Sequence, residues 1–100
     1  MPKKITASLV ENIKPDPDKR VEIADTILRG LYLIVQPSGA RSWALRYTFA
    51  RRSRKLTIGR ADVLKVADAR EMARQALLLV AEGRDPGAEK QERASAANTI

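Results

Sequence analysis

The sequence contains neither cysteine nor histidine among its 100 residues. Without cysteine the chain can form no disulfide and no thiolate metal site, which is compatible with a reducing cytosol. Without either residue the usual zinc ligands are missing, and without histidine the commonest general base at neutral pH is missing too. We therefore expect no metal, no cofactor, no small-molecule substrate and no catalytic centre in this chain.

Long hydrophobic runs are also missing. No apolar run approaches the roughly 18 residues of a membrane span, and the basic segment 1–6 lacks the apolar region and cleavage pattern of a secretion signal. The hydrophobic content of 44% and the charged content of 31% are typical of a soluble globular protein. A chain of this length suits one compact domain with one modest core. We expect a single cytoplasmic domain that does not enter a membrane.

Acidic residues are absent from residues 41–60, although this segment carries seven arginine and lysine residues. The formal net charge of the chain is +7, which equals the charge of this segment. The positive and negative charges of the other eighty residues cancel. A concentrated basic stretch on a neutral body is typical of a protein that binds a polyanion. A solvated basic surface is the alternative.

Alternating apolar and polar residues predict strands at 21–25, 31–36, 42–49 and 55–59, the first of them weakly. The last three are joined by short connections, which favours an antiparallel arrangement because parallel strands need a long crossover. Helical periodicity predicts a short helix at 6–13 and a longer one at 66–82, ended by Gly83. The expected fold is α+β, with a three- to four-stranded antiparallel sheet packed on one face by the C-terminal helix, and a short N-terminal helix.

Period-two alternation divides the sheet residues into two faces. The apolar face packs on the helix stripe of Ala69, Met72, Ala73, Ala76, Leu77 and Val80, and it consists of Leu31, Leu33, Val35, Trp43, Leu45, Tyr47, Phe49, Leu56 and Ile58. The opposite face is expected to stay open, and it carries Tyr32, Ile34, Gln36, Ala44, Arg46, Thr48, Lys55 and Thr57. Arg41, Arg51, Arg52, Arg54 and Arg60 are expected at the hairpin ends and the rim.

The open face suits duplex DNA, because the major groove accepts β-strands. Arginine and lysine on this face could donate to guanine, Gln36 could pair with adenine, and a threonine could touch a base or a thymine methyl. Rim arginines would hold phosphates, and a small alanine would permit close approach. The candidate DNA contacts are Tyr32, Gln36, Arg41, Ala44, Arg46, Thr48, Arg51, Arg52, Arg54, Lys55, Thr57 and Arg60.

Other interpretations remain for several of these residues. Thr48 and Thr57 could be ordinary strand formers on a wet face, and the basic cluster 51–55 could simply protect an edge from pairing with other chains. Arg46 argues against edge protection, because it lies in the middle of a strand. RNA binding by stacking ranks low, since Tyr32 is the one aromatic residue expected on the open face.

Short motifs occur along the chain in a definite order. The first motif is T-A-S-L-V-E-N-I-K at 6–14, and the second consists of Asp25 with Gly30, Leu31, Leu33 and Val35. The third is P-S-G at 37–39, followed by Ser42, Trp43, Arg46 and Tyr47. The last three are L-T-I-G-R at 56–60, A-D-A-R at 67–70 and G-R-D-P at 83–86. This ordered set, over about residues 5–88, resembles the N-terminal arm-type DNA-binding domain of phage and genomic-island integrases, which are tyrosine recombinases. Departures from the family pattern are Ile34 for a basic residue, Lys65 for a helix-capping hydroxyl residue, and Ala61-Asp62 for an aromatic-proline pair.

The resemblance implies a non-catalytic domain at 1–88 that binds arm-type sites in double-stranded DNA. It implies that 89–100 is a linker, or a frayed helix, leading toward a core-binding domain absent from this chain, with the catalytic domain beyond. The parent protein would be bacterial or phage-encoded and associated with the nucleoid. The alternative is a protein–protein module that contacts other integrase protomers during assembly.

Overall fold

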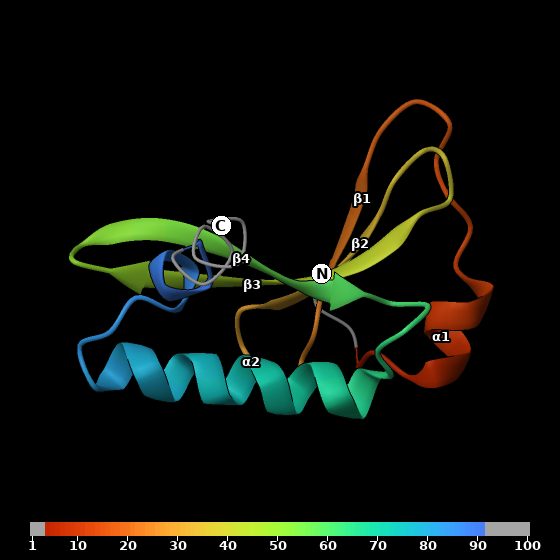
Figure 1. Ribbon diagram of the computed structural model, residues 1–100. Helices are drawn as coiled ribbons and strands as arrows, with labels where there is room; N and C mark the ends of the chain where they lie inside the picture. The colour runs from red at the N-terminus through yellow and green to blue at the C-terminus, as the bar shows by residue number, and fades with distance from the viewer. Residues whose placement is uncertain (1–3, 92–100) are drawn as a thin grey trace, which may run out of the picture.

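The computed structural model, which describes residues 4–91, contains one sheet and two main helices (Figure 1). In chain order the elements are α1 (Ala7–Asn12), β1 (Val21–Ala24), β2 (Leu31–Val35), β3 (Arg41–Phe49), β4 (Arg52–Arg60) and α2 (Val66–Ala81). The strands pair antiparallel in the order β1-β2-β3-β4, so the predicted α+β fold is confirmed. Residues 86–91 form a further short helical segment, and the rest of the predicted linker, 92–100, lies outside the described residues.

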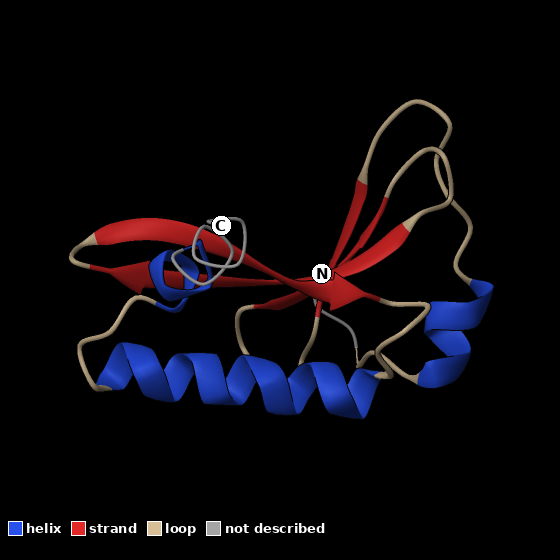
Figure 2. Cartoon of the chain, viewed as in Figure 1, coloured by secondary structure: helices blue, strands red, loops and turns tan. Residues whose placement is uncertain are grey.

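Helix α2 covers one face of the sheet, and the core lies between these two layers (Figure 2). The predicted apolar face is confirmed: Leu31, Leu33, Trp43 and Leu45 are completely buried. The helix contributes Ala69, Ala73 and Ala76 to this core, and such small side chains let a helix lie close to a sheet. Trp43 is satisfied at its polar end, because Nε1 donates to the Leu64 carbonyl at 3.0 Å.

Three exposure predictions are wrong. Met72 is 44% exposed instead of buried, whereas Ile34 and Ala44, expected on the open face, are 3% and 1% exposed. Both buried residues lie on interior strands, and the side chains of neighbouring strands flank them: Glu22 and Ser42 beside Ile34, Tyr32 and Thr57 beside Ala44. Tyr32 and Thr57 are both larger than Ala44, so they cover this small side chain even where no helix lies above it.

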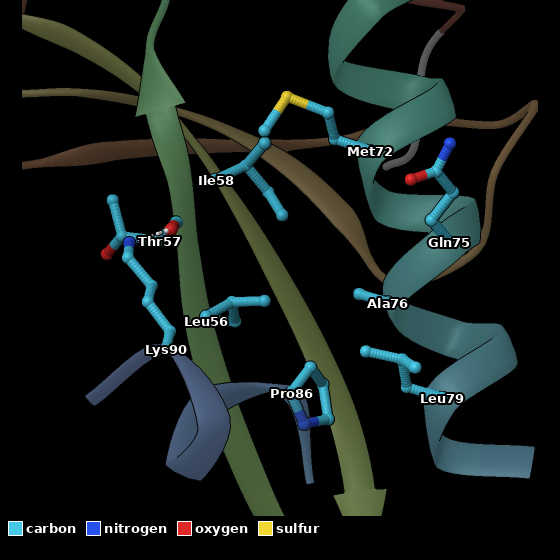
Figure 3. Close-up of a pocket in the computed structure, with 9 residues that line it drawn as sticks. All are labelled: Leu56, Thr57, Ile58, Met72, Gln75, Ala76, Leu79, Pro86 and Lys90. Atoms are coloured by element: carbon cyan, nitrogen blue, oxygen red, sulfur yellow. Dashed lines mark hydrogen bonds between the residues drawn. The ribbon is translucent and has the colours of Figure 1, made fainter. Parts of the chain in front are cut away.

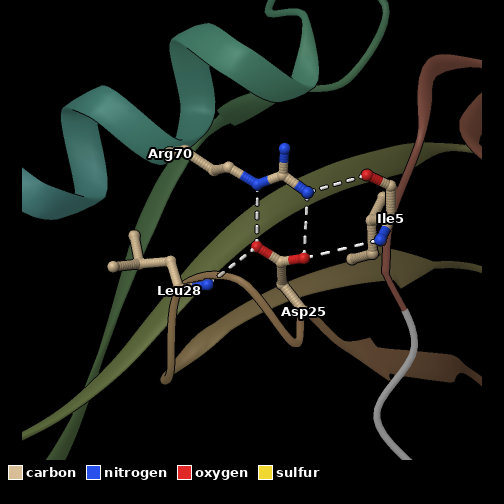
Figure 4. Close-up of polar contacts among 4 residues, drawn as sticks. All are labelled: Ile5, Asp25, Leu28 and Arg70. Carbon is tan, nitrogen blue, oxygen red and sulfur yellow. Dashed lines mark hydrogen bonds and ion pairs between the residues drawn. The ribbon is translucent and has the colours of Figure 1, made fainter.

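A buried ion pair joins three parts of the chain (Figure 4). Arg70 of α2 donates from Nε and Nη2 to the Asp25 carboxylate at 2.9 and 3.0 Å, and from Nη2 to the Ile5 carbonyl at 2.8 Å. The same carboxylate accepts from the backbone N–H groups of Ile5 and Leu28. Burial acts to raise the pKa of Asp25, but these hydrogen bonds outweigh it and the pKa lies below its ordinary value. The pair therefore stabilises the contact between the N-terminus, the β1–β2 connection and α2.

The β3–β4 hairpin turns through two residues, because Phe49 pairs with Arg52. The turn residues Ala50 and Arg51 both have positive φ angles, of 52° and 66°. A two-residue turn of this kind prefers asparagine or glycine, and most other residues, alanine and arginine among them, are strained there. The basic tip of this hairpin is thus held in a conformation that its residues do not favour.

Replacing Ala50 with asparagine is expected to stabilise the domain by about 0.5–1 kcal/mol, because asparagine tolerates the left-handed region better than alanine does. For a domain of this size the midpoint of thermal unfolding should rise by a few degrees, as measured by circular dichroism. The matched control is Ala40→Asn at an exposed turn position, which should produce no comparable rise. An unchanged or lower midpoint for Ala50→Asn would contradict the assignment of strain to the hairpin tip.

Candidate nucleic-acid interface

The sheet face that points away from α2 carries a polar and basic surface built from β3 and β4. Arg46 pairs with Lys55 and Thr48 pairs with Ser53, and residues paired across antiparallel strands share a face. All four side chains are exposed. We call this group, together with exposed Thr57 of β4, the outer face.

A β-bulge opposite Trp43 and Ala44 changes the end of β4. Gly59 pairs with Trp43, while Thr57 pairs with Ala44, so Ile58 has no partner of its own. The bulge shifts the alternation by one residue. Arg60 therefore pairs with Ser42 and lies on the same side as Arg46, which simple alternation from Lys55 would not predict. Arg60 also forms an exposed ion pair with Asp62 at 2.8 Å.

Arg46 lies at the centre of the outer face and points away from α2, as the alternation predicts. Its guanidinium carbon lies 4.4 Å from the centre of the Tyr32 ring, within the range of a cation–π contact. Its Nη2 atom donates to the carboxylate of Glu22 in β1. Its backbone N–H donates to the Gly30 carbonyl at 2.7 Å. Gly30 has a φ of 96°, and a Cβ there would lie 2.6 Å from the Arg46 carbonyl oxygen, so this approach requires glycine.

Arg51 and Arg52 are exposed at the hairpin tip. Arg51 lies in the turn itself, and Arg52 pairs with Phe49, which places it on the α2 side of the sheet. Gln36 is half-buried at the end of β2, where its backbone closes the turn to Ala40. It lies away from the hairpin tip and adjoins Arg41 and Arg60 around a shallow hollow.

Two of the candidate arginines, Arg41 and Arg54, lie on the α2 side of the sheet and are bonded there to other parts of the fold. Arg41 donates from Nη1 to the Val10 carbonyl at 2.7 Å and from Nη2 to the Ile13 carbonyl at 3.3 Å. It thereby satisfies carbonyl groups at the C-terminal end of α1. Arg54 pairs with Tyr47 across the strands, which places it on the α2 side of the sheet and not on the outer face.

Arg54 belongs to a polar cluster that holds the segment after α2. Its Nε atom lies 3.2 Å from Asp85 Oδ2, and the Tyr47 hydroxyl donates to Asp85 Oδ1. Burial and the hydrogen bond to Asp85 raise the pKa of Tyr47, while the hydrogen bond from Tyr47 lowers the pKa of Asp85. Gly87 packs against this hydroxyl, and a Cβ there would lie 2.7 Å from it. The G-R-D-P motif thus attaches the chain end to the β3–β4 hairpin.

A groove lined mostly by apolar side chains lies between α2 and the free edge of β4 (Figure 3). Lys90, from the segment after α2, donates to the Thr57 carbonyl at 2.6 Å at one end of the groove. The lining residues are Leu56, Thr57, Ile58, Met72, Gln75, Ala76, Leu79, Pro86 and Lys90. Lys90 is the one ionisable side chain in this lining.

Within residues 4–91 no group of three metal-ligating side chains is brought together, and no helix is both long and apolar enough to cross a membrane. What the described chain offers is a polar, basic sheet face with a charged hairpin tip. Sequence reasoning missed two side chains on this side of the sheet, namely Ser53 of the outer face and the partner of Arg46, Glu22. The signal for Glu22 was present, since alternation in the weak strand at 21–25 places it on the side opposite Val21 and Ile23.

Comparison with known proteins shows the family of the chain. Residues 5–93 match the arm DNA-binding domain family. The chain is 30% identical over 82 residues to the prophage integrase IntZ of Escherichia coli K12, and 33% identical over 82 residues to the integrase of Shigella phage Sf6. Each alignment covers 82% of this chain and 20% of the relative, so the chain spans about one fifth of the curated relatives it matches. The chain belongs to the arm DNA-binding domain family and is homologous to phage and prophage integrases.

Proposed function

We propose that this chain binds arm-type sites in duplex DNA through the outer face and the hairpin tip, as a non-catalytic N-terminal domain of a tyrosine recombinase. One observation carries the proposal: Arg46 and Lys55 project from paired positions on a face that α2 leaves uncovered, and Arg51 and Arg52 are exposed at the tip of the same hairpin. β3 and β4 contain no acidic residue. A two-stranded ribbon of this kind fits the major groove.

The residues divide into two roles by position. Arg46 and Lys55, at the centre of the ribbon, would meet base edges, with Thr48 and Thr57 able to contact a base or a thymine methyl. Arg51, Arg52 and Arg60, at the tip and the rim, would contact phosphates and set the register without reading sequence. We assign no DNA contact to the side chains of Ala44, Arg41 and Arg54. Ala44 is buried, and Arg41 and Arg54 lie on the α2 side of the sheet, where they are bonded to carbonyl groups after α1 and to the nearly buried carboxylate of Asp85.

The proposal extends to the organisation of the parent protein. Residues 1–88 would form the DNA-binding unit, and 89–100 would lead toward a core-binding domain, with catalysis beyond it. The relatives support this, because they are integrases about five times longer than the aligned region. The parent protein would act at the nucleoid, where its DNA lies.

Salt dependence tests the electrostatic part of the proposal. With three basic groups at phosphates, log K for duplex DNA should fall against log salt with a slope of roughly −3. The measurement is fluorescence anisotropy of a labelled duplex titrated with the chain between about 50 and 200 mM salt. A slope near zero, or failure to bind duplexes at the lowest salt, would refute phosphate contact by this face.

The apolar groove favours a second candidate function, assembly with other integrase protomers. Met72 in this groove is 44% exposed, and β4 is an edge strand that could accept a further strand. Sizing of the chain with and without duplex DNA distinguishes the two functions. A dimer that forms without DNA and is indifferent to added DNA would support the assembly function.

A further inference from the structure

Arg46 is held in place by side chains from two neighbouring strands. Its guanidinium carbon lies over the Tyr32 ring of β2, and its Nη2 atom is bonded to Glu22 of β1. Arg20 lies 3.7 Å from the same carboxylate. Because β1, β2 and β3 are adjacent in the sheet, an aromatic plane and a carboxylate together restrain one long and otherwise flexible side chain.

The position of Glu22 is unusual for a face that carries positive charge. Within residues 4–91 it is the only acidic residue that lies in a strand, and it is bonded to the central arginine of that face. A carboxylate there opposes the attraction of phosphates over a distance of several ångströms. Two arginines flank it, however, so the cluster of Arg20, Glu22 and Arg46 keeps a net positive charge.

The remaining donors of Arg46 are available for a ligand. A guanidinium has five N–H donors, and among the described residues the hydrogen bond from the Arg46 side chain is the one from Nη2 to Glu22. The side chain of Arg46 is still 46% exposed, against 28% for Glu22. The restrained group therefore presents further N–H donors to solvent, and guanine offers two acceptors in the major groove at matching spacing.

We propose that Glu22 is a positioning residue that, together with Tyr32, orients Arg46 to read a guanine instead of a phosphate. This inference rests on the proposed function. A freely rotating arginine loses considerable rotamer entropy when it is immobilised on DNA. An arginine already restrained by a ring and a carboxylate loses less, and its donors approach one base pair from one direction.

The test is selection of bound duplexes from a random library by the 100-residue chain and by its Glu22→Gln variant, followed by affinity measurements on the selected duplex and single-base substitutions of it. For Glu22→Gln we expect discrimination at one guanine position to fall about fivefold or more, while affinity for scrambled duplexes stays equal or rises. The matched control is Glu82→Gln, which removes the same charge from an exposed position at the end of α2 and should leave discrimination unchanged. Tyr32→Leu, which removes the ring, should reproduce the loss at the same position.

The outcomes separate the two proposals. If the unmodified chain binds no duplex, the proposed function fails. If it binds duplexes without any base preference, or if Glu22→Gln and Tyr32→Leu both retain full discrimination at every position, DNA binding stands and the positioning role of Glu22 is overturned. An equal gain of affinity by Glu22→Gln on all duplexes, with discrimination intact, would likewise overturn it, since it would show that Glu22 acts only as a repelling charge.

Discussion

Replacing Arg46 with alanine is expected to abolish preference at one base pair of the selected site. A bidentate contact to guanine contributes about 1–3 kcal/mol of discrimination, a factor of roughly 5 to 150. The loss should appear on the selected duplex and be much smaller on a duplex substituted at that position, because the substituted base pair offers no matching acceptors. Competition binding with both duplexes measures the difference.

The control for this substitution is Arg52→Ala at the exposed hairpin tip. An arginine that contacts phosphate contributes equally on every sequence, so its removal should weaken selected and scrambled duplexes by the same factor and reduce the salt slope by about one. Equal losses on both duplexes for Arg46→Ala would contradict a base-reading role for Arg46. Equal losses would indicate that Arg46 contacts a phosphate instead of a base.

Replacing Arg70 with methionine is expected to destabilise the domain by about 3–5 kcal/mol, a large part of the 5–15 kcal/mol that holds a typical domain folded. The Asp25 side chain is completely buried, and without Arg70 its charge would have no counter-ion. Urea unfolding monitored by circular dichroism measures the loss. Arg70→Lys keeps the charge but cannot donate from two nitrogens to both oxygens. Its free energy of unfolding should therefore lie between that of the unmodified chain and that of Arg70→Met.

The matched control lies one turn along the same helix. Arg74 forms an ion pair with Glu71, but both side chains are about half exposed, and exposed pairs contribute little to stability. Arg74→Met should therefore change the free energy of unfolding far less than Arg70→Met does. Similar losses for the two variants would contradict the assignment of a special role to the buried pair.

The same pair makes stability depend on pH in a stated direction. The folded-state pKa of Asp25 lies below its ordinary value, so its contribution is fully present above about pH 4 and is lost as pH falls through the folded pKa. In Arg70→Met, burial without a counter-ion should raise the pKa of Asp25 instead. The free energy of unfolding of the unmodified chain should therefore exceed that of Arg70→Met by a large amount at pH 7 and by a smaller amount near pH 3. A difference independent of pH would contradict this account.

The sequence by itself determined which residues form the elements and which way most of them face. Strand alternation is a property of the local backbone, since successive Cβ atoms point to opposite sides. That rule alone places Trp43 and Leu45 in the core and Arg46 on the opposite side. The cap of α1 is equally local, because the Thr6 side chain accepts from the Leu9 N–H, three residues further along the chain. The same local rules did not predict the β-bulge that places Arg60 on the same side of the sheet as the outer face.

Only the tertiary structure decided which charged side chains remain available to a partner. Arg41 is bonded to carbonyl groups some 30 residues away in the sequence, Arg54 to Asp85, and Arg46 to Glu22. A long side chain takes its partner from whatever element packs beside it, and local periodicity carries no information about elements distant in the chain. The burial of Ala44 has the same cause, because it depends on the neighbours that strand pairing supplies.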